Sequence, residues 1–351
     1  MAIDRRELEA RIKRGEPIRN ESLAGLDLSE ACLAGGIFEE VDLRGVRLAG
    51  SALSESIFTG CDLRGARLSS ARLDHTVWSK CIFHDVTADG VQAVYANFAE
   101  CDFRSVALNG ADLRHGNFAV TMLSSVDLRD ADLTKTSFAD CAEVSCDFSG
   151  ASLVETAFVQ GDLSRSCFRG LRAQKAVFVK CTLGAQDFSG QALPAFQFLE
   201  CDLGGARFDS SALENTGFRG SNLAYASFEG AIAPRCLFVE ATLDGARLHR
   251  AQLTQSIFLK ARLVQADLAG AKLDQCIFSE AEASNARFIA ADLTYADFSG
   301  ARLLYADFTA ATLFRAKLHR VQDQGATFDS RALALGDDPE LLEAETWQPN
   351  I

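Results

Sequence analysis

Leu and Phe recur along this chain with a period of five residues, from Leu23 to Leu333, and the register never shifts. This range holds sixty-three such positions, and fifty-six of them are Leu, Phe or Trp. Two residues before each lies a small residue, usually Ala, Cys, Ser, Thr, Val or Gly. A period of five matches neither an α-helix nor a β-strand. A chain with one large and one small inward residue in every five has to turn a corner in each unit.

A longer period of twenty residues is superimposed on the period of five, as four corners closing one coil would require. Every twentieth centre from Phe38 to Phe298 is aromatic, which predicts one continuous aromatic wall of a coiled stack. We call this the Phe wall, and its inward centres are Phe38, Phe58, Trp78, Phe98, Phe118, Phe138, Phe158, Phe178, Phe198, Phe218, Phe238, Phe258, Phe278 and Phe298.

Units that begin at Ala111, Ala131, Ala291 and Cys201 each continue with Asp and Leu. These units resemble those of the pentapeptide-repeat family, whose unit is A(D/N)LXX. The resemblance covers about residues 21–333 and implies an all-β fold, a right-handed quadrilateral β-helix of about sixteen coils. Such a solenoid buries its Leu and Phe side chains between coils, which leaves no room for an interior substrate pocket.

The two ends of the chain carry helix signals that predict caps for the open coils. Asp4 and Glu7 fit a capping box, and Gly15 is placed to end a short helix. Near the other end, Asp337 or Asp338 with Pro339 starts a second helix, which is followed by Trp347. We therefore expect an N-terminal capping helix in residues 1–20, the β-helix in 21–333, and a C-terminal helical cap and tail in 334–351.

Composition favours a folded protein of the reducing cytoplasm. The 351 residues carry a net charge of −13, and no run is apolar and long enough to span a membrane. The charged start of the chain does not fit a secretion signal. Nine of the eleven cysteines occupy the small inward position, where a free thiol packs well. Core packing is the favoured interpretation, and a redox or zinc role is the alternative.

No residue set predicts a reaction, so we expect no catalytic residues, no metal site, no cofactor and no enzymatic activity. Phosphate-loop, dinucleotide and HExxH motifs are absent from the sequence. His75 and His115 share one outward column with Tyr95 between them, too far apart to ligate one metal. Glu143 stands where Leu is expected. Either it is a buried acid with a perturbed pKa, or a bulge turns it outward and lets Val144 fill the core.

The acidic surface raises the hypothesis of a DNA mimic, because some pentapeptide-repeat proteins mimic DNA and bind DNA gyrase. A mimic needs concentrated negative charge. Here the column containing Asp27 and Asp127 is interleaved with Arg47 and Arg67. Gyrase-protecting members often carry projecting loops, and the unbroken register leaves no room for one. The sequence also lacks the basic stripe that would predict direct binding of nucleic acid.

Outward aliphatic residues flank the inward aromatic residues of the Phe wall and form the second candidate surface. The candidate interface, here called the aliphatic strip, comprises Val159, Val177, Val179, Leu199, Leu237, Val239, Ile257, Leu259 and Ile277. An apolar strip that faces solvent suggests an interface with another protein or with a second copy of this chain. The alternative is that a flat β face simply favours such residues.

The segment from Ile12 to Ala31 combines a short charged helix, a glycine and the first coil. In this it resembles pentapeptide-repeat proteins encoded beside bacterial type VI secretion spike genes, which implies an accessory role in effector delivery. The sequence therefore predicts a non-enzymatic protein-binding scaffold or adaptor, with a protein that binds DNA gyrase as the alternative.

Overall fold

The computed structural model describes residues 3–347. These residues separate into two compact units, Met1–Leu183 and Gly184–Ile351, which are described one at a time. The boundary falls beside Gln186, the first of three poor fits to the small-residue position that continue with Gln191 and Phe196. Phe196 is nevertheless fully buried and Gln186 nearly so. The expectation of one domain over residues 21–333 stays a prediction.

The first unit begins with helix α1 (Arg5–Lys13), as the capping signal predicted. Asp4 caps it, and its Oδ1 accepts the backbone N–H of Glu7 at 2.9 Å. Leu8 and Ile12 are buried, and Arg5 donates to the carbonyl oxygens of two residues in the first coil, both at 2.8 Å. The helix therefore covers an apolar surface and satisfies backbone groups that the first coil would otherwise expose.

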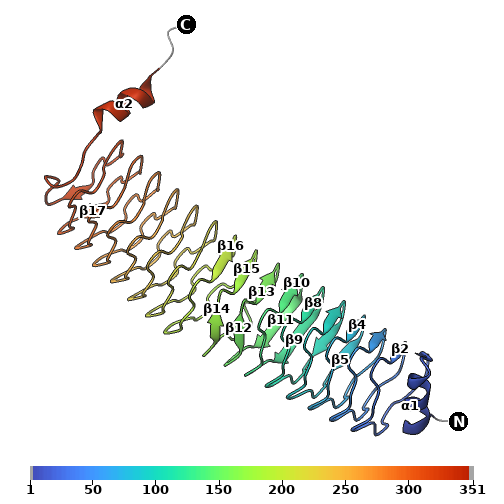
Figure 1. Ribbon diagram of the computed structural model, residues 1–351. Coiled ribbons are helices and arrows are strands. Elements are labelled where there is room, and N and C mark those ends of the chain that lie inside the picture. The colour runs from blue at the N-terminus through green and yellow to red at the C-terminus, as the bar shows by residue number, and fades with distance from the viewer. Residues whose placement is uncertain (1–2, 348–351) are drawn as a thin grey trace. The chain divides into compact units, whose positions relative to one another are not determined.

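Short parallel strands follow α1 and repeat every twenty residues (Figure 1). In the first unit they are β1 (Ile18–Arg19), β2 (Ile37–Glu39), β3 (Ile57–Thr59), β4 (Val77–Ser79), β5 (Ile82–His84), β6 (Asn97–Ala99), β7 (Asp102–Arg104), β8 (Asn117–Ala119), β9 (Met122–Asp127), β10 (Ser137–Ala139), β11 (Ala142–Asp147), β12 (Ser152–Val154), β13 (Ala157–Val159), β14 (Arg172–Gln174) and β15 (Val177–Val179). In the second unit they are β16 (Gln197–Leu199), β17 (Asp307–Phe308) and β18 (Thr327–Phe328), and helix α2 (Pro339–Thr346) comes last.

Each strand pairs with the strand one coil away, in a register of twenty residues. Along the Phe wall of the first unit the order is β1-β2-β3-β4-β6-β8-β10-β13-β15, and Phe38 pairs with Phe58. A neighbouring wall has the order β11-β9-β7-β5, and a third carries the pair β12-β14. In the second unit isolated parallel bridges continue the same register, for example from Leu237 to Ile257. The fold is therefore a β-solenoid of about sixteen turns with two short terminal helices, as predicted.

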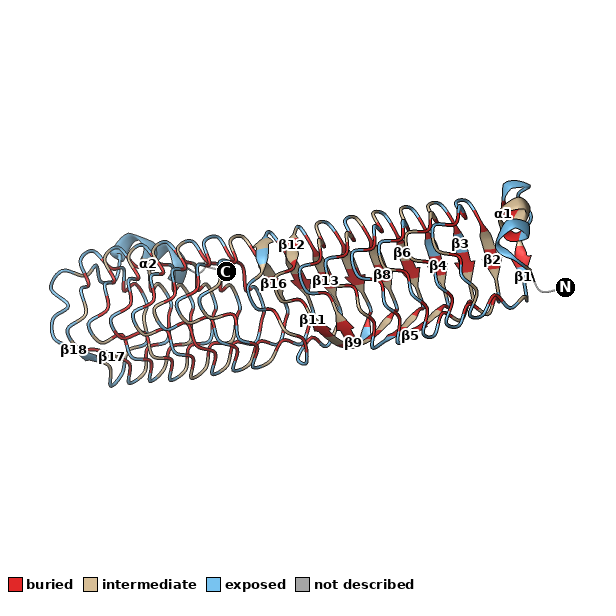
Figure 2. Cartoon of the chain, turned by 90° about the horizontal axis from the view of Figure 1, so that it is seen from below, coloured by how far each residue is buried: buried red, intermediate tan, exposed pale blue. Residues whose placement is uncertain are grey.

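The core of each unit is a stack of inward side chains, shown as buried segments alternating with exposed ones in Figure 2. In the second unit the Phe258 ring lies 4.7 Å from the rings of both Phe238 and Phe278, with nearly parallel planes. Rings of the adjoining wall meet these stacks edge to face, as Phe228 meets Phe238 at 5.8 Å and 85°. Both arrangements suit the quadrupole of an aromatic ring.

Left-handed backbone conformations mark the corners of the coils. Among the described residues, each one with φ between +50° and +77° has a number divisible by five, with a single exception. Glycine occupies many of these corners because it lacks the Cβ that makes this conformation costly. The exception is Glu143, with φ of 50°, while Ser145 is not among the left-handed residues.

This exception is a β-bulge in β11, where the pairing with β9 shifts register between Ala142 and Ser145. Glu143 is exposed, and Val144 is 96% buried in the position left open. The bulge interpretation is confirmed and the buried-acid interpretation is wrong, because turning the corner two residues early places the carboxylate in water instead of in the core.

Two weak inward positions in the first unit, Ala88 and Ala93, are both buried. They line an interior apolar cavity of about 20 Å³ together with Phe83, Phe98 and Phe103. Phe83 and Phe103 are larger than the Leu that is common on their wall, so they fill part of the volume that alanine leaves. Neighbouring residues thus partly compensate for the break in the pattern.

Helix α2 forms where its signals predicted, with Asp338 as N-cap and Pro339 in the first turn. Its attachment differs from that of an apolar cap, because none of its described residues is buried (Figure 2). Instead, Glu345 contacts Arg320 at 2.7 Å and His319 at 3.3 Å, and the Asp338 N–H donates to His319 Nδ1. Leu341 and Trp347 remain exposed. Residues 348–351 of the expected tail lie outside the described residues.

Candidate protein-binding face

The aliphatic strip lies on outward positions of the Phe wall, and each unit carries part of it. In the first unit Val159 of β13 pairs with Val179 of β15, beside Val177. All three valines are half-buried, because coils above and below cover part of each side chain. They flank the fully buried Phe178 and the buried Phe158.

The second unit carries the larger part, which we call the second-unit strip: Leu199, Leu237, Val239, Ile257, Leu259 and Ile277. Parallel bridges join Leu237 to Ile257 and Ile257 to Ile277, so these three side chains follow one another along one column. Leu237 and Ile277 are each 38% exposed, and the other four are half-buried. An aliphatic surface of this kind is not needed for the core, which the inward Phe side chains already fill.

The second-unit strip adjoins Gly217. Gly217 is buried and bridges to Gln197 on one side and to Leu237 on the other. A Cβ added to Gly217 would overlap the end of the Gln197 side chain. The Gln197 side chain therefore lies over Gly217 and fills the space that the glycine leaves in the column.

Charged residues border the second-unit strip and hold one another in place. Lys260 Nζ lies 3.6 Å from Glu280, and Arg235 pairs with Glu214 and donates to Asn215. Exposed pairs of this kind add little stability. They do give the apolar strip a polar rim, which is the usual anatomy of a protein interface.

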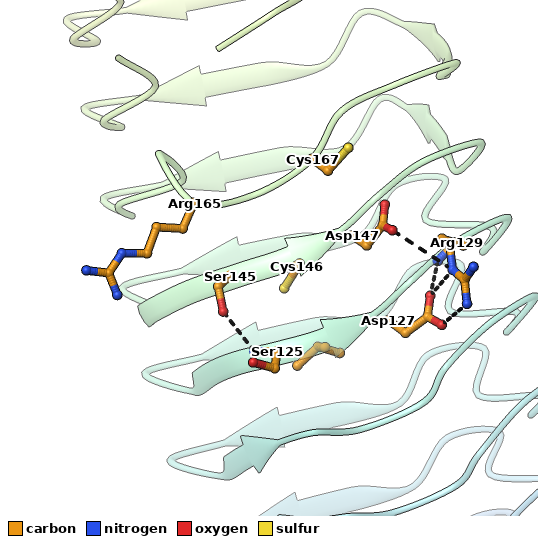
Figure 3. A pocket seen from close by; sticks show the side chains of 9 residues that line it. Ser125, Asp127, Arg129, Ser145, Cys146, Asp147, Arg165 and Cys167 are labelled. Carbon is orange, nitrogen blue, oxygen red and sulfur yellow. Dashed lines mark hydrogen bonds and ion pairs between the residues drawn. The ribbon is translucent and has the colours of Figure 1, made fainter. Parts of the chain in front are cut away.

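The first unit also has an open polar cleft of about 480 Å³ beside the bulge (Figure 3). Its lining includes Arg129, which pairs with Asp127 at 2.5 Å and Asp147 at 3.9 Å. Arg165 lines the same cleft, and its side chain extends away from this cluster in Figure 3. The Cys146 thiol is fully buried, and burial raises its pKa, so it is not a thiolate nucleophile at neutral pH. Both carboxylate partners of Arg129 line the cleft, so its guanidinium is already paired within the chain.

The acidic residues of the first unit are mostly neutralised locally. Arg44 and Arg64 donate through paired bonds to Asp42 and Asp62, and these bonds lower the pKa of both carboxyl groups. Hydrogen bonds from Ser29, and then from Arg47, lower the pKa of Asp27 to about 2. In the second unit Arg287 pairs with Asp267 at 3.0 Å. These pairings interleave the charges, as the sequence predicted, and do not concentrate negative potential.

Two histidines stack in an aromatic column, and nine of the cysteines are buried. His75, Tyr95 and His115 stack in one outward column with ring separations of 5.0 Å and 4.6 Å. Burial raises the pKa of the Cys141 thiol to about 11 and of Cys236 to about 12. No group of three or more potential metal ligands is found within residues 3–347. No helix in the same range is long and apolar enough to cross a membrane.

Sequence reasoning located the strip residues but did not foresee that the Gln197 side chain lies over Gly217, or the contacts of α2. The glycine was visible as an outward residue without a side chain, which was the available signal. The positions of Val177 and Leu237 on outward columns follow the five-residue rule. Whether these residues form an interface stays a prediction.

Comparisons with solved structures return matches at low identity. QnrB1, a plasmid-mediated fluoroquinolone resistance protein, is 16% identical over 54% of this chain and 92% of its own, with a TM-score of 0.32. HetL, involved in heterocyst differentiation regulation in the cyanobacterium Nostoc sp. strain PCC 7120, is 23% identical over 90% of this chain and 96% of its own, with a TM-score of 0.19. A search of curated proteins returned no match.

The family model described as pentapeptide repeats matches eight times. The matched segments are 22–60, 61–104, 81–118, 101–140, 201–238, 221–258, 261–294 and 291–322, which together cover more than half of the chain. The chain belongs to the pentapeptide repeat family.

Proposed function

We propose that this protein is a non-enzymatic protein-binding scaffold, and that it binds its partner through the aliphatic strip. The observation that carries the proposal is the second-unit strip, where Leu237 and Ile277 stay partly exposed on a face whose core is already complete. Exposed apolar strips bordered by charged residues are typical of binding surfaces. The interleaved charge argues against nucleic acid as the direct partner.

The test is site-specific photo-crosslinking from the strip. A photoreactive residue at position 257 should crosslink to a partner, and one at Gln265, exposed on another wall, should not. In a chain that carries the photoreactive residue at position 257, the variant Leu237→Lys/Leu259→Lys should lose the crosslink, whereas the matched control Gln252→Lys/Gln265→Lys should keep it. If crosslinks form equally from positions 257 and 265, the strip is not the binding site.

A finer proposal concerns the biological setting: an accessory of type VI secretion effector delivery that works in the cytoplasm. It rests on the resemblance of the segment from Ile12 to Ala31. The buried thiols fit a reducing compartment. Capture of a secretion spike or effector protein that depends on Ile257 would support this setting, and an unaltered secretion profile in a deletion strain would contradict it.

The second candidate is a DNA-mimicking protein that binds DNA gyrase, motivated by the net charge of −13. The ion pairs of Asp42, Asp127 and Asp267 weigh against it, because a DNA mimic presents unpaired carboxylates to its target. A gyrase supercoiling assay separates the two candidates. Inhibition at sub-micromolar protein would favour the gyrase candidate over the scaffold.

A further inference from the structure

We propose that the occupant of the second-unit strip is a second copy of this chain, bound face to face and antiparallel. This inference rests on the proposed function and names the partner. A two-fold axis would run along the strand direction, midway between the coil of Leu237 and the coil of Ile257. Under this symmetry, a residue that lies a given number of coils from the axis in one copy faces the residue that lies the same number of coils on the other side of the axis in the second copy.

The apolar residues of the strip match under this symmetry. Leu237 faces Ile257 of the second copy, and Val239 faces Leu259. Ile277, which is 38% exposed, faces Gly217, over which the Gln197 side chain lies, so Ile277 meets the Gln197 side chain of the second copy. Each of these contacts occurs twice in the interface.

Charges on the rim of the strip match in the same register. Glu240 faces Lys260 of the second copy, and both side chains are exposed in the free chain. Along the same column Glu200 faces Gly300, and Glu280 faces Gly220. From the coil of Gln197 to the coil of Asp297, no two like charges face each other.

Neighbouring registers fit worse. An axis centred on the Leu237 coil would place Glu240 against Glu240 of the second copy. An axis centred on the Ile257 coil would place Lys260 against Lys260, so like charges would meet in both cases. Moving the axis one coil toward the C-terminus would place Asp297 against Leu237, which desolvates a carboxylate. Moving it one coil the other way would place Arg219 against Val239. Only the proposed register joins the apolar side chains without either conflict.

The matching area suits a weak dimer. Six coils at the spacing of paired strands extend for roughly 29 Å, and five residues across the wall span about 16 Å, which gives about 450 Å² on each copy. The total of about 900 Å² lies at the low end of specific protein interfaces. We therefore expect a dissociation constant in the micromolar range.

Disulfide trapping tests the orientation. Leu199 and Ser299 lie five coils apart in one chain, roughly 24 Å, so cysteines at these positions cannot join within a chain. In the antiparallel dimer Leu199 faces Ser299 of the second copy. In a background of Cys32→Ser/Cys167→Ser, the variant Leu199→Cys/Ser299→Cys should give a covalent dimer on mild oxidation, and neither single variant should.

A parallel arrangement would place Leu199 close to Leu199 of the second copy. A covalent dimer from Leu199→Cys alone would therefore overturn the antiparallel geometry. Failure of the double variant to crosslink, although both cysteines react with a maleimide, would overturn it too.

Light scattering tests the dimer itself. The unmodified protein should approach twice the monomer mass as its concentration rises to about 200 μM, and Leu237→Lys/Ile257→Lys should weaken association by about a hundredfold or more. Lys260→Glu should weaken it, and Glu240→Lys/Lys260→Glu should restore it. A monomer throughout this range would overturn self-association, and so would a dimer that survives the lysine substitutions. In either case crosslinking of a different protein to position 257 would still support the scaffold.

Discussion

Replacing Phe258 by Ala tests the stacked core and also measures how much of the chain unfolds together. The ring is fully buried and stacks at 4.7 Å on a ring above and a ring below, Phe238 and Phe278. A buried Phe→Ala change costs about 3–5 kcal/mol, because a cavity remains where the ring was. Loss of two aromatic contacts places the expected cost near the upper end of that range. Phe258→Leu retains much of the volume and should cost roughly half as much.

The shift in melting temperature depends on the size of the cooperative unit. Unfolding entropy scales with length at about 2.1 cal/mol/K per residue, so about 4 kcal/mol lowers Tm by about 5 °C if all 351 residues unfold together. If only the unit Gly184–Ile351 unfolds in the transition, the same cost lowers Tm by about 11 °C, and a second calorimetric transition stays in place. Scanning calorimetry distinguishes the two.

The control is Gln255→Ala, an exposed position on the same coil, which should move Tm by less than about 1 °C. A Tm for Phe258→Ala equal to that of the control would refute the stacked core. So would a Phe258→Leu variant less stable than Phe258→Ala, because the argument depends on lost volume.

Three further predictions concern the bulge, the thiols and acid. Glu143→Gly should keep stability or raise it by up to about 1 kcal/mol, because glycine adopts positive φ without strain. Val144→Ala should cost about 2 kcal/mol, because Val144 is buried. If chemical denaturation gave the opposite order of stabilities, the bulge would be contradicted. In the native protein a maleimide should modify Cys32, which is exposed, and Cys167, which is half-buried. After denaturation, mass spectrometry should find all eleven thiols modified. Protection of both Cys32 and Cys167 in the native protein, or bound zinc, would show another role for the thiols. Arg44, Arg64 and Arg129 lower the pKa values of their carboxylate partners in the folded protein. These pairs therefore stabilise the fold at any pH above the unfolded carboxyl pKa, which is near 4. That stabilisation is lost as pH falls through the lower pKa values of the folded state. Tm should therefore stay level from about pH 7 to 5 and fall below about pH 4, and a decline beginning at pH 6 would implicate histidines instead.

The sequence predicted the solenoid well because its inward residues obey a strict geometric rule. One large and one small inward residue in each unit are enough to specify four walls, and Phe38, Phe58 and Trp78 stack as the period of twenty requires. The same rule identified Glu143 as an anomaly, since a carboxylate cannot remain in a column of Leu without a local change of register. The strictness of the core made both the rule and its exception visible.

The attachment of α2 could not be predicted in the same way. Its caps are local signals, and Asp338 and Pro339 placed its start correctly. Its contacts depend on which surface the chain returns to, and that surface is polar. His319 and Arg320 bind Glu345 there, while Leu341 stays exposed. An apolar residue on a short helix therefore did not indicate burial.

The outward positions of a solenoid are the ones that folding leaves free, and this decides where function is encoded. The core of the second unit is complete without Leu237, Ile257 or Leu259, because inward Phe and Leu side chains already fill each coil. A polar residue at any of these positions would cost the fold little and would improve solubility. Across the proposed two-fold axis Leu237 meets Ile257 and Glu240 meets Lys260, so apolar and charged positions of this wall match in one register. A flat face selected only for β-propensity has no reason to match charges across that axis, and this favours recognition over propensity as the origin of the strip.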